Sequence, residues 1–125
     1  MRVKIKATNI KISPEVEDYA YQKLTYLERF LPEAKNEPDL VIAEIELGKP
    51  SKHHKKGDVF YCELNLSIGK RLLRSSNFGR SITEAIDKVQ EDIERKVRKE
   101  KEKSREGIRR RRKLMRGFKL FKFKK

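Results

Sequence analysis

The sequence predicts a small α+β domain of two layers, in which a mostly antiparallel four-stranded sheet carries two helices on one face. Three observations lead to this fold class. Four segments alternate apolar and polar residues, two longer segments repeat apolar residues at steps of three and four, and together they follow the order β-α-β-β-β-α. Each segment has one apolar face, and two layers bury these faces against one another.

The first strand is expected over Arg2 to Ala7, where basic residues alternate with Val3, Ile5 and Ala7. The first helix begins after Ser13, an N-cap residue, with Pro14 at the first helical position, where its missing amide costs nothing. It is expected to reach Pro32. Its apolar face is formed by Val16, Tyr19, Ala20, Leu24, Leu27 and Leu31.

A polar connector is expected between Pro32 and Asp39, and a second strand follows from Val41 to Leu47. The next residues, Gly48 to Asp58, are rich in turn residues and lysines and have no periodicity. They are expected to form an exposed hairpin loop between antiparallel strands.

The third strand is expected from Phe60 to Ile68, with Cys62 on its apolar face. Gly69 and Lys70 predict a tight turn into a short fourth strand, about Arg71 to Ser76, where the alternation is weaker. The polar face of the sheet is expected to remain in solvent, with cross-strand Lys–Glu pairs as routine surface contacts; its residues are Lys4, Lys6, Glu44, Glu46, Glu63 and Asn65.

The second helix is expected from the stretch Arg80 to Lys103. Ser81 and Glu84 have the spacing of a capping box, which satisfies orphan amides at a helix start. One apolar stripe follows, made of Ile82, Ala85, Ile86, Val89, Ile93 and Val97. Past Val97 the apolar repeat stops while the charges continue, so the helix is expected to leave its domain there as a solvated basic rod.

Charge is concentrated at the C-terminal end of the 125-residue chain, whose formal net charge is +14. Residues 1–97 hold 18 Lys/Arg against 16 Asp/Glu, net +2, whereas residues 98–125 hold 15 against 3, net +12. We therefore divide the chain into an α+β domain at 1–103 and a basic, aromatic-containing tail at 104–125. Such a tail binds polyanions, with RNA, DNA and acidic lipid all admissible and nucleic acid favoured.

The tail is expected to be disordered when free, because Gly107 and Gly117 weaken a helix and the five like charges from Arg109 to Lys113 repel one another. Its phenylalanines are interleaved with lysines. Such aromatic rings can stack on unpaired bases or sit in a lipid headgroup layer.

The sequence contains no pattern that predicts an enzyme, a cofactor or a metal site. His53 and His54 are adjacent, so in an extended loop they point apart. The single cysteine, Cys62, is expected to be a packed thiol, and a single cysteine is compatible with a reducing cytoplasm. No apolar run of membrane-spanning length and no signal-peptide pattern is present. A cytoplasmic, monomeric protein without a small-molecule substrate is expected.

Two helical segments resemble the ribosome hibernation-promoting factor family, also called ribosome-associated inhibitor A. The first segment matches at Ile12-Ser13-Pro14 and at Lys23, Leu24, Leu27 and Glu28; the second matches at Ala85, Ile86, Asp87 and at Glu94, Arg95, Val97 and Lys99. The similarity covers about residues 1–103. Thr83 and Asp92 depart from the family pattern, and the separate C-terminal dimerisation domain of the long form is missing.

The resemblance implies a double-stranded-RNA-binding-like fold that sits in the messenger and transfer RNA channel of the small ribosomal subunit. Lys23, Arg95, Lys99 and Lys103 match basic family positions, and Lys88 can substitute for a family lysine that is replaced by Asp92. Together with the cations of the tail they form the expected phosphate-contacting set: Lys23, Lys88, Arg95, Lys96, Lys99, Lys103, Arg109, Arg110, Arg111, Arg112 and Lys113.

The leading hypothesis is a translation inhibitor that binds the rRNA of the small subunit, plugs this channel and protects idle ribosomes, as in a stress response. One alternative is a general RNA-binding or ribosome-assembly protein that acts away from the channel. A third possibility is a membrane-surface tail fused to a small domain.

Overall fold

The computed structural model describes residues 1–50 and 59–123, and within these ranges the side chains of 104–106 and 115–123 are not described. The elements are β1 (Arg2–Thr8), α1 (Pro14–Glu28), α2 (Pro32–Asn36), the 3-10 helix η1 (Pro38–Leu40), β2 (Val41–Gly48), β3 (Phe60–Ile68), β4 (Arg71–Gly79) and α3 (Ile82–Phe123). The predicted order β-α-β-β-β-α is confirmed, with two short helical elements added between α1 and β2.

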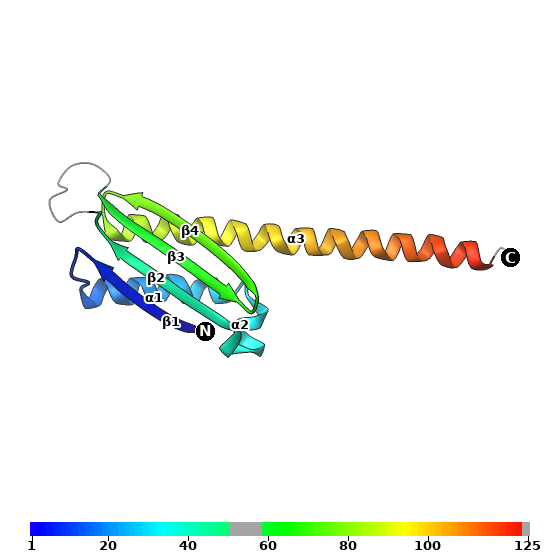
Figure 1. Ribbon diagram of the computed structural model, residues 1–125, viewed down its shortest axis with the longest axis horizontal. Helices are drawn as coiled ribbons and strands as arrows, with labels where there is room; N and C mark the ends of the chain where they lie inside the picture. The colour runs from blue at the N-terminus through cyan, green and yellow to red at the C-terminus, as the bar shows by residue number, and fades with distance from the viewer. Residues whose placement is uncertain (51–58, 124–125) are drawn as a thin grey trace.

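The four strands form one sheet in the order β1-β2-β3-β4. β1 is parallel to β2, while β2–β3 and β3–β4 are antiparallel, which confirms a mostly antiparallel sheet. The parallel pair is possible because α1 carries the chain across from β1 toward β2. Both long helices lie on one side of the sheet (Figure 1). The two-layer α+β architecture is therefore as predicted.

The core lies between the sheet and the two long helices. Its buried residues come from every long element except the edge strand β1 and match the predicted apolar faces: Ala20, Leu24, Leu27, Leu31, Val41, Ala43, Ile45, Leu47, Cys62, Leu64, Leu66, Ile68, Leu73, Ala85, Ile86, Val89, Ile93 and Val97. On the opposite, polar face, Lys4 is in register with Glu44 and Lys6 with Glu46. The Lys6 ammonium lies 3.9 Å from a Glu46 carboxylate oxygen, which is the expected cross-strand pairing.

Two element boundaries differ from the prediction, and one short helix was not predicted. α1 ends at Glu28, although Leu31 remains buried beyond it. The polar connector contains α2, which has only five residues and one buried side chain, Ala34, too few to give a periodic signal. β4 runs to Gly79 because its last residues pair with the start of β3, although Ser75, Ser76 and Asn77 are poor strand formers. Residues 51–58 of the expected hairpin loop lie outside the described residues.

The most extended element is α3, which continues far past the sheet as a single helix (Figure 1). From Lys101 to Phe123 it projects over about 33 Å at 1.5 Å per residue. The expected basic rod is thus present, and it is longer than predicted. The tail from residue 104, expected to be disordered when free, is helical here as far as Phe123. Arginine and lysine, which are frequent in it, are good helix formers.

Candidate nucleic-acid interface

The start of α3 is fixed by the predicted capping box and by a close approach to β4. The Glu84 amide donates to the Ser81 hydroxyl at 3.1 Å, and the Arg80 amide donates to the Glu84 carboxylate at 3.3 Å. A Cβ atom at Gly79 would lie 2.7 Å from the Ala85 amide nitrogen and 3.0 Å from the Ser81 carbonyl oxygen. The end of β4 and the first turn of α3 can therefore approach this closely only with glycine at position 79.

From this start α3 runs along β4 with its apolar stripe on the sheet, and α1 lies on its other side (Figure 1). The two flanks of α3 consequently meet different surroundings. One flank faces β4, the edge strand of the sheet, and the other faces α1. The predicted phosphate-contacting residues that lie within the body are divided between these flanks.

On the β4 flank, two lysines of α3 bond to backbone carbonyls of the edge strand. The Lys88 ammonium donates to the Phe78 carbonyl oxygen at 3.0 Å, and the Lys96 ammonium donates to the Arg74 carbonyl oxygen. Lys88 and Lys96 are eight residues apart on the helix, and Phe78 and Arg74 are four residues apart on the strand. Both separations are about 12–13 Å, so the same kind of contact is made twice along α3 and β4. These lysines cover polar groups that an edge strand otherwise leaves unpaired.

Asp92 lies between these lysines. Its carboxylate is 3.2 Å from the Lys96 ammonium and 3.8 Å from the Arg95 guanidinium. A hydrogen bond from Ser75 lowers the pKa of Asp92, and Lys96 and Arg95 lower it further, against the opposing effect of partial burial. Asp92 therefore ties α3 to β4.

The outward part of this flank forms an exposed cationic strip, defined as Arg95, Lys99 and Lys103. The side chain of Arg95 is 70% exposed, and Lys99 and Lys103 are also exposed. The three residues are spaced by four along the helix, so they project from one side. Within the part of the chain that the structure describes, Lys99 and Lys103 have no ion-pair partner.

Lys23 lies on the other flank of α3, on α1. Its ammonium is 3.3 Å from the Asp87 carboxylate, which also accepts a hydrogen bond from the Tyr19 hydroxyl. Partial burial lowers the pKa of Lys23, but the hydrogen bond and negative charge of Asp87 outweigh this effect, so that the pKa is raised. The structure does not bring Lys23 together with the cationic strip.

The same flank carries further aromatic and charged contacts between α1 and α3. The Tyr26 hydroxyl donates to Glu94 at 3.1 Å, and Glu94 also pairs with Arg98 at 3.3 Å. The Arg98 guanidinium lies 5.1 Å from the ring centroid of Phe30. Arg98 is thus engaged with Glu94 and with Phe30, which follows the end of α1, and the cations available to an external anion lie mainly on the β4 flank.

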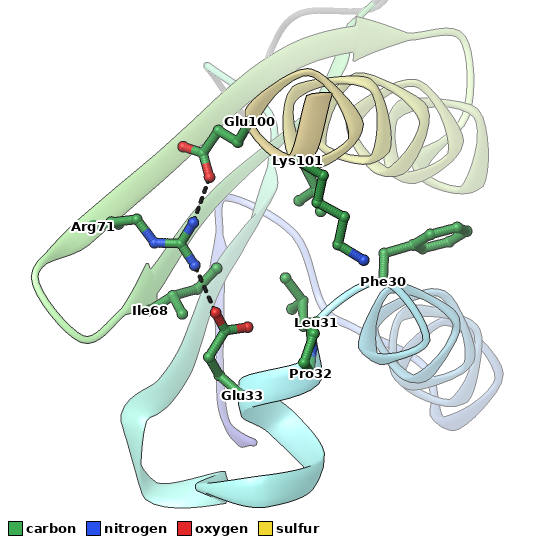
Figure 2. A pocket seen from close by; sticks show the side chains of 9 residues that line it. Phe30, Leu31, Pro32, Glu33, Ile68, Arg71, Glu100 and Lys101 are labelled. Carbon is green, nitrogen blue, oxygen red and sulfur yellow. Dashed lines mark hydrogen bonds and ion pairs between the residues drawn. The ribbon is translucent and has the colours of Figure 1, made fainter. Parts of the chain in front are cut away.

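The point where α3 leaves the body is held by Arg71 of β4. Its guanidinium lies 3.0 Å from Glu33 of α2 and 2.8 Å from Glu100 of α3, so that one side chain joins three elements (Figure 2). Beside it is a cavity of about 270 Å³ that is lined by both apolar and charged side chains. Its lining comprises Phe30, Leu31, Pro32, Glu33, Ile68, Arg71, Val97, Glu100 and Lys101.

Beyond the ion pairs of Arg71 with Glu33 and Glu100, the cations from Arg109 to Lys113 are all exposed on the projecting helix. They are separated from the body by several helical turns, so they cannot contact the same phosphates as Arg95. The predicted set therefore comprises a strip beside the sheet, a distal group on the rod, and Lys23 apart from both.

One basic residue near the strip was not predicted from the sequence. Arg74 is exposed on β4, and its Nε atom donates to the Asn65 side-chain oxygen at 2.8 Å. Its backbone carbonyl accepts from Lys96 of α3, whereas its side chain lies with Asn65 on the polar face of the sheet, away from the helices. Because the fourth strand alternates only weakly, its sequence pattern does not determine which way Arg74 faces.

No metal-binding cluster of three or more His, Cys, Asp or Glu side chains exists within residues 1–50 and 59–123. Cys62 is fully buried on the core side of β3, as predicted, and burial raises its pKa to about 12. A thiol in this state is protonated at neutral pH and is a poor nucleophile. In the described part of the chain, no helix has the length and apolar character needed to cross a membrane. His53 and His54 lie outside the described residues.

Comparison with known proteins gives one family and a group of similar solved structures, two of which are named below. The family model described as sigma 54 modulation protein / S30EA ribosomal protein matches residues 3–105. The N-terminal domain of Protein Y from Thermus thermophilus is 22% identical with a TM-score of 0.62, over 79% of this chain and 98% of that one. A ribosomal subunit interface protein from Coxiella burnetii is 15% identical with a TM-score of 0.61, over 81% and 98%. These two likenesses show the fold. No curated protein sequence matches the chain.

Proposed function

The chain belongs to the sigma 54 modulation protein / S30EA ribosomal protein family, and on this premise we propose that it is a ribosome-binding translation inhibitor. In this proposal it occupies the channel of the small subunit through which messenger and transfer RNA pass, and it protects idle ribosomes. The family is one of ribosome-associated proteins, and a member whose surface is this basic has rRNA as its natural partner.

The observation that carries the proposal is the presence of two groups of exposed cations along α3. The first is the cationic strip beside the sheet, and the second is the run from Arg109 to Lys113 on the projecting helix. Release of counterions from each neutralised phosphate drives such binding without reading the base sequence. The domain would then act by occupying space while the cations hold it in place.

The cationic strip and the distal run are the principal contacts in this proposal. Lys88 and Lys96 lie beside the strip but already bond to carbonyls of β4, and Lys23 already pairs with Asp87. A phosphate contact by any of these three would have to compete with a bond inside the domain. The proposal also includes a cytoplasmic location, a monomeric state and the absence of a small-molecule substrate.

Sedimentation of the protein with purified small subunits tests the proposal. The protein is expected to comigrate with small subunits and whole ribosomes and to inhibit translation in vitro. Inhibition should disappear when messenger RNA already fills the channel, because the two compete for space. Comigration that is insensitive to bound messenger RNA would favour the alternative of an RNA-binding or assembly protein that acts away from the channel. Absence of any comigration would reject ribosome binding.

A further inference from the structure

The projecting part of α3 carries cationic side chains on every side. Arg109, Arg110, Arg111, Arg112 and Lys113 are consecutive and exposed. Successive residues of an α-helix are rotated by about 100°, so five of them cover the full circumference. This differs from the cationic strip near the sheet, where the cations share one side.

A partner with a single flat surface would neutralise only part of this segment. Such a partner would leave the cations on the far side of the helix in water, with no anion to reduce their mutual repulsion. Like charges three and four residues apart destabilise a helix. Arg109 and Lys113 form one such pair, and Arg110 and Lys113 form another. Phosphates on two or more sides would relieve this repulsion and stabilise the helical state.

A regular RNA duplex does not offer such a site. Its major groove is deep and narrow, and an α-helix with its side chains is about 10–12 Å in diameter. The minor groove is wide and shallow, and so contacts one side only. Folded RNA provides the required geometry where two backbone segments approach each other and line both walls of a cleft.

We propose that residues 107–114 of α3 insert into a cleft of folded RNA whose opposite walls are phosphate backbones. The inference rests on the proposed function and adds the kind of RNA site that the distal helix takes. Gly107 has no side chain, and a Cβ added there would meet no other atom within 4 Å, so the start of this segment stands clear of the rest of the domain.

Two matched double variants test the enclosure. Arg110 and Lys113 lie within about 40° of Lys99 around the helix axis, so they continue the side of the cationic strip. Arg111 and Arg112 lie about 120° and 140° from Lys99, on the opposite side. The variants R110Q/K113Q and R111Q/R112Q each remove two charges in full-length protein, and circular dichroism of both checks that helix content is unchanged.

The measurement is the affinity of the protein for purified small subunits at several salt concentrations. An RNA duplex of about 20 base pairs is the second probe. This length exceeds the roughly 16 base pairs that a double-stranded-RNA-binding domain spans. Both variants are expected to reduce the slope of log affinity against log salt by a similar amount, about 1.4–1.8 for two lost phosphate contacts. On the duplex, which lacks a cleft, the first variant is expected to have the larger effect.

Other outcomes separate this inference from the proposed function. If the wild-type protein binds small subunits and only R110Q/K113Q reduces the slope, the helix lies on a one-sided surface and the enclosure is rejected. An unchanged slope in both variants also rejects it, as does stronger binding to phosphatidylserine vesicles than to subunits. If the wild-type protein fails to bind small subunits at all, the proposed function is rejected, and this inference with it.

Discussion

The ammonium group of Lys88 lies 3.0 Å from the backbone carbonyl oxygen of Phe78, on the outer edge of the sheet. Lys96 makes the same kind of contact with the Arg74 carbonyl. The two lysines therefore serve the fold, whatever they contribute to RNA binding. They also show how a helix lying beside a sheet can protect an edge strand with side chains.

Replacing Lys88 and Lys96 by methionine is expected to destabilise the domain, because each change leaves an edge carbonyl without its donor. Each should reduce the free energy of unfolding by about 0.5–1.5 kcal/mol, measured by urea denaturation. Lys99→Met is the matched control and is expected to leave stability unchanged, since Lys99 is exposed and has no ion-pair partner among the described residues. Equal stability of all three variants would contradict the edge-protecting role.

Charge reversal at Arg95 and Lys99 tests the cationic strip. The double variant R95E/K99E is expected to weaken small-subunit binding strongly, because repulsion replaces attraction at two phosphate contacts. Both side chains lie off the apolar stripe, so the fold should remain intact by circular dichroism. The acidic pair Glu91 and Glu102 on α3 provides a control, in which E91K/E102K should not weaken binding. Wild-type affinity of R95E/K99E at physiological salt would reject the strip as an RNA contact.

Lys23→Gln separates a phosphate contact from a contact inside the domain. Because Lys23 pairs with Asp87 and lies on the α1 flank, we expect an unchanged salt dependence of ribosome binding. A modest loss of stability, within about 1 kcal/mol for a pair still open to solvent, should accompany it. A fall in the salt slope of about 0.9 would instead show that Lys23 binds a phosphate, as the family resemblance implies.

Gly79→Ala tests the close approach of β4 and α3. The added Cβ would lie 2.7 Å from the Ala85 amide nitrogen, which is a backbone atom that cannot rotate away. The first turn of α3 must then shift, and an overpacking cost of about 1–3 kcal/mol is expected. Thermal denaturation measures it, with Gly107→Ala as the control, because that position has open space around it. A stable Gly79→Ala protein would show that this junction can relax.

The buried thiol of Cys62 gives a prediction about pH. Burial raises its pKa in the folded protein to about 12, whereas the pKa of a cysteine in an unfolded chain is about 8.5. Between these values the unfolded chain holds fewer protons than the folded one, so this group makes the protein less stable as pH rises above about 8.5. In Cys62→Ala this decline should be shallower, as measured by urea denaturation from neutral to alkaline pH. An identical pH dependence in both proteins would contradict the burial effect.

The sequence by itself determined the long elements of the body. Alternation of apolar residues identified the strands, and steps of three and four identified the two helices, because each element has one face that must be buried. Ser13 and the Ser81–Glu84 capping box located both helix starts, since orphan amides need acceptors in the side chains nearby. Short or irregular parts such as α2 and the end of β4 carried no periodic signal and were missed.

Only the tertiary structure decided which cations lie together. Lys23, Lys88 and Arg95 are equivalent as basic residues on helices, yet Lys23 lies on the α1 flank of α3, whereas Lys88 and Arg95 lie on the β4 flank, and each has a different partner. Local spacing places residues around one helix, whereas the packing of α1 on one flank and β4 on the other determines which side chains are already bonded. The division of α3 into a packed part, a cationic strip and a rod charged on all sides follows from where that packing ends.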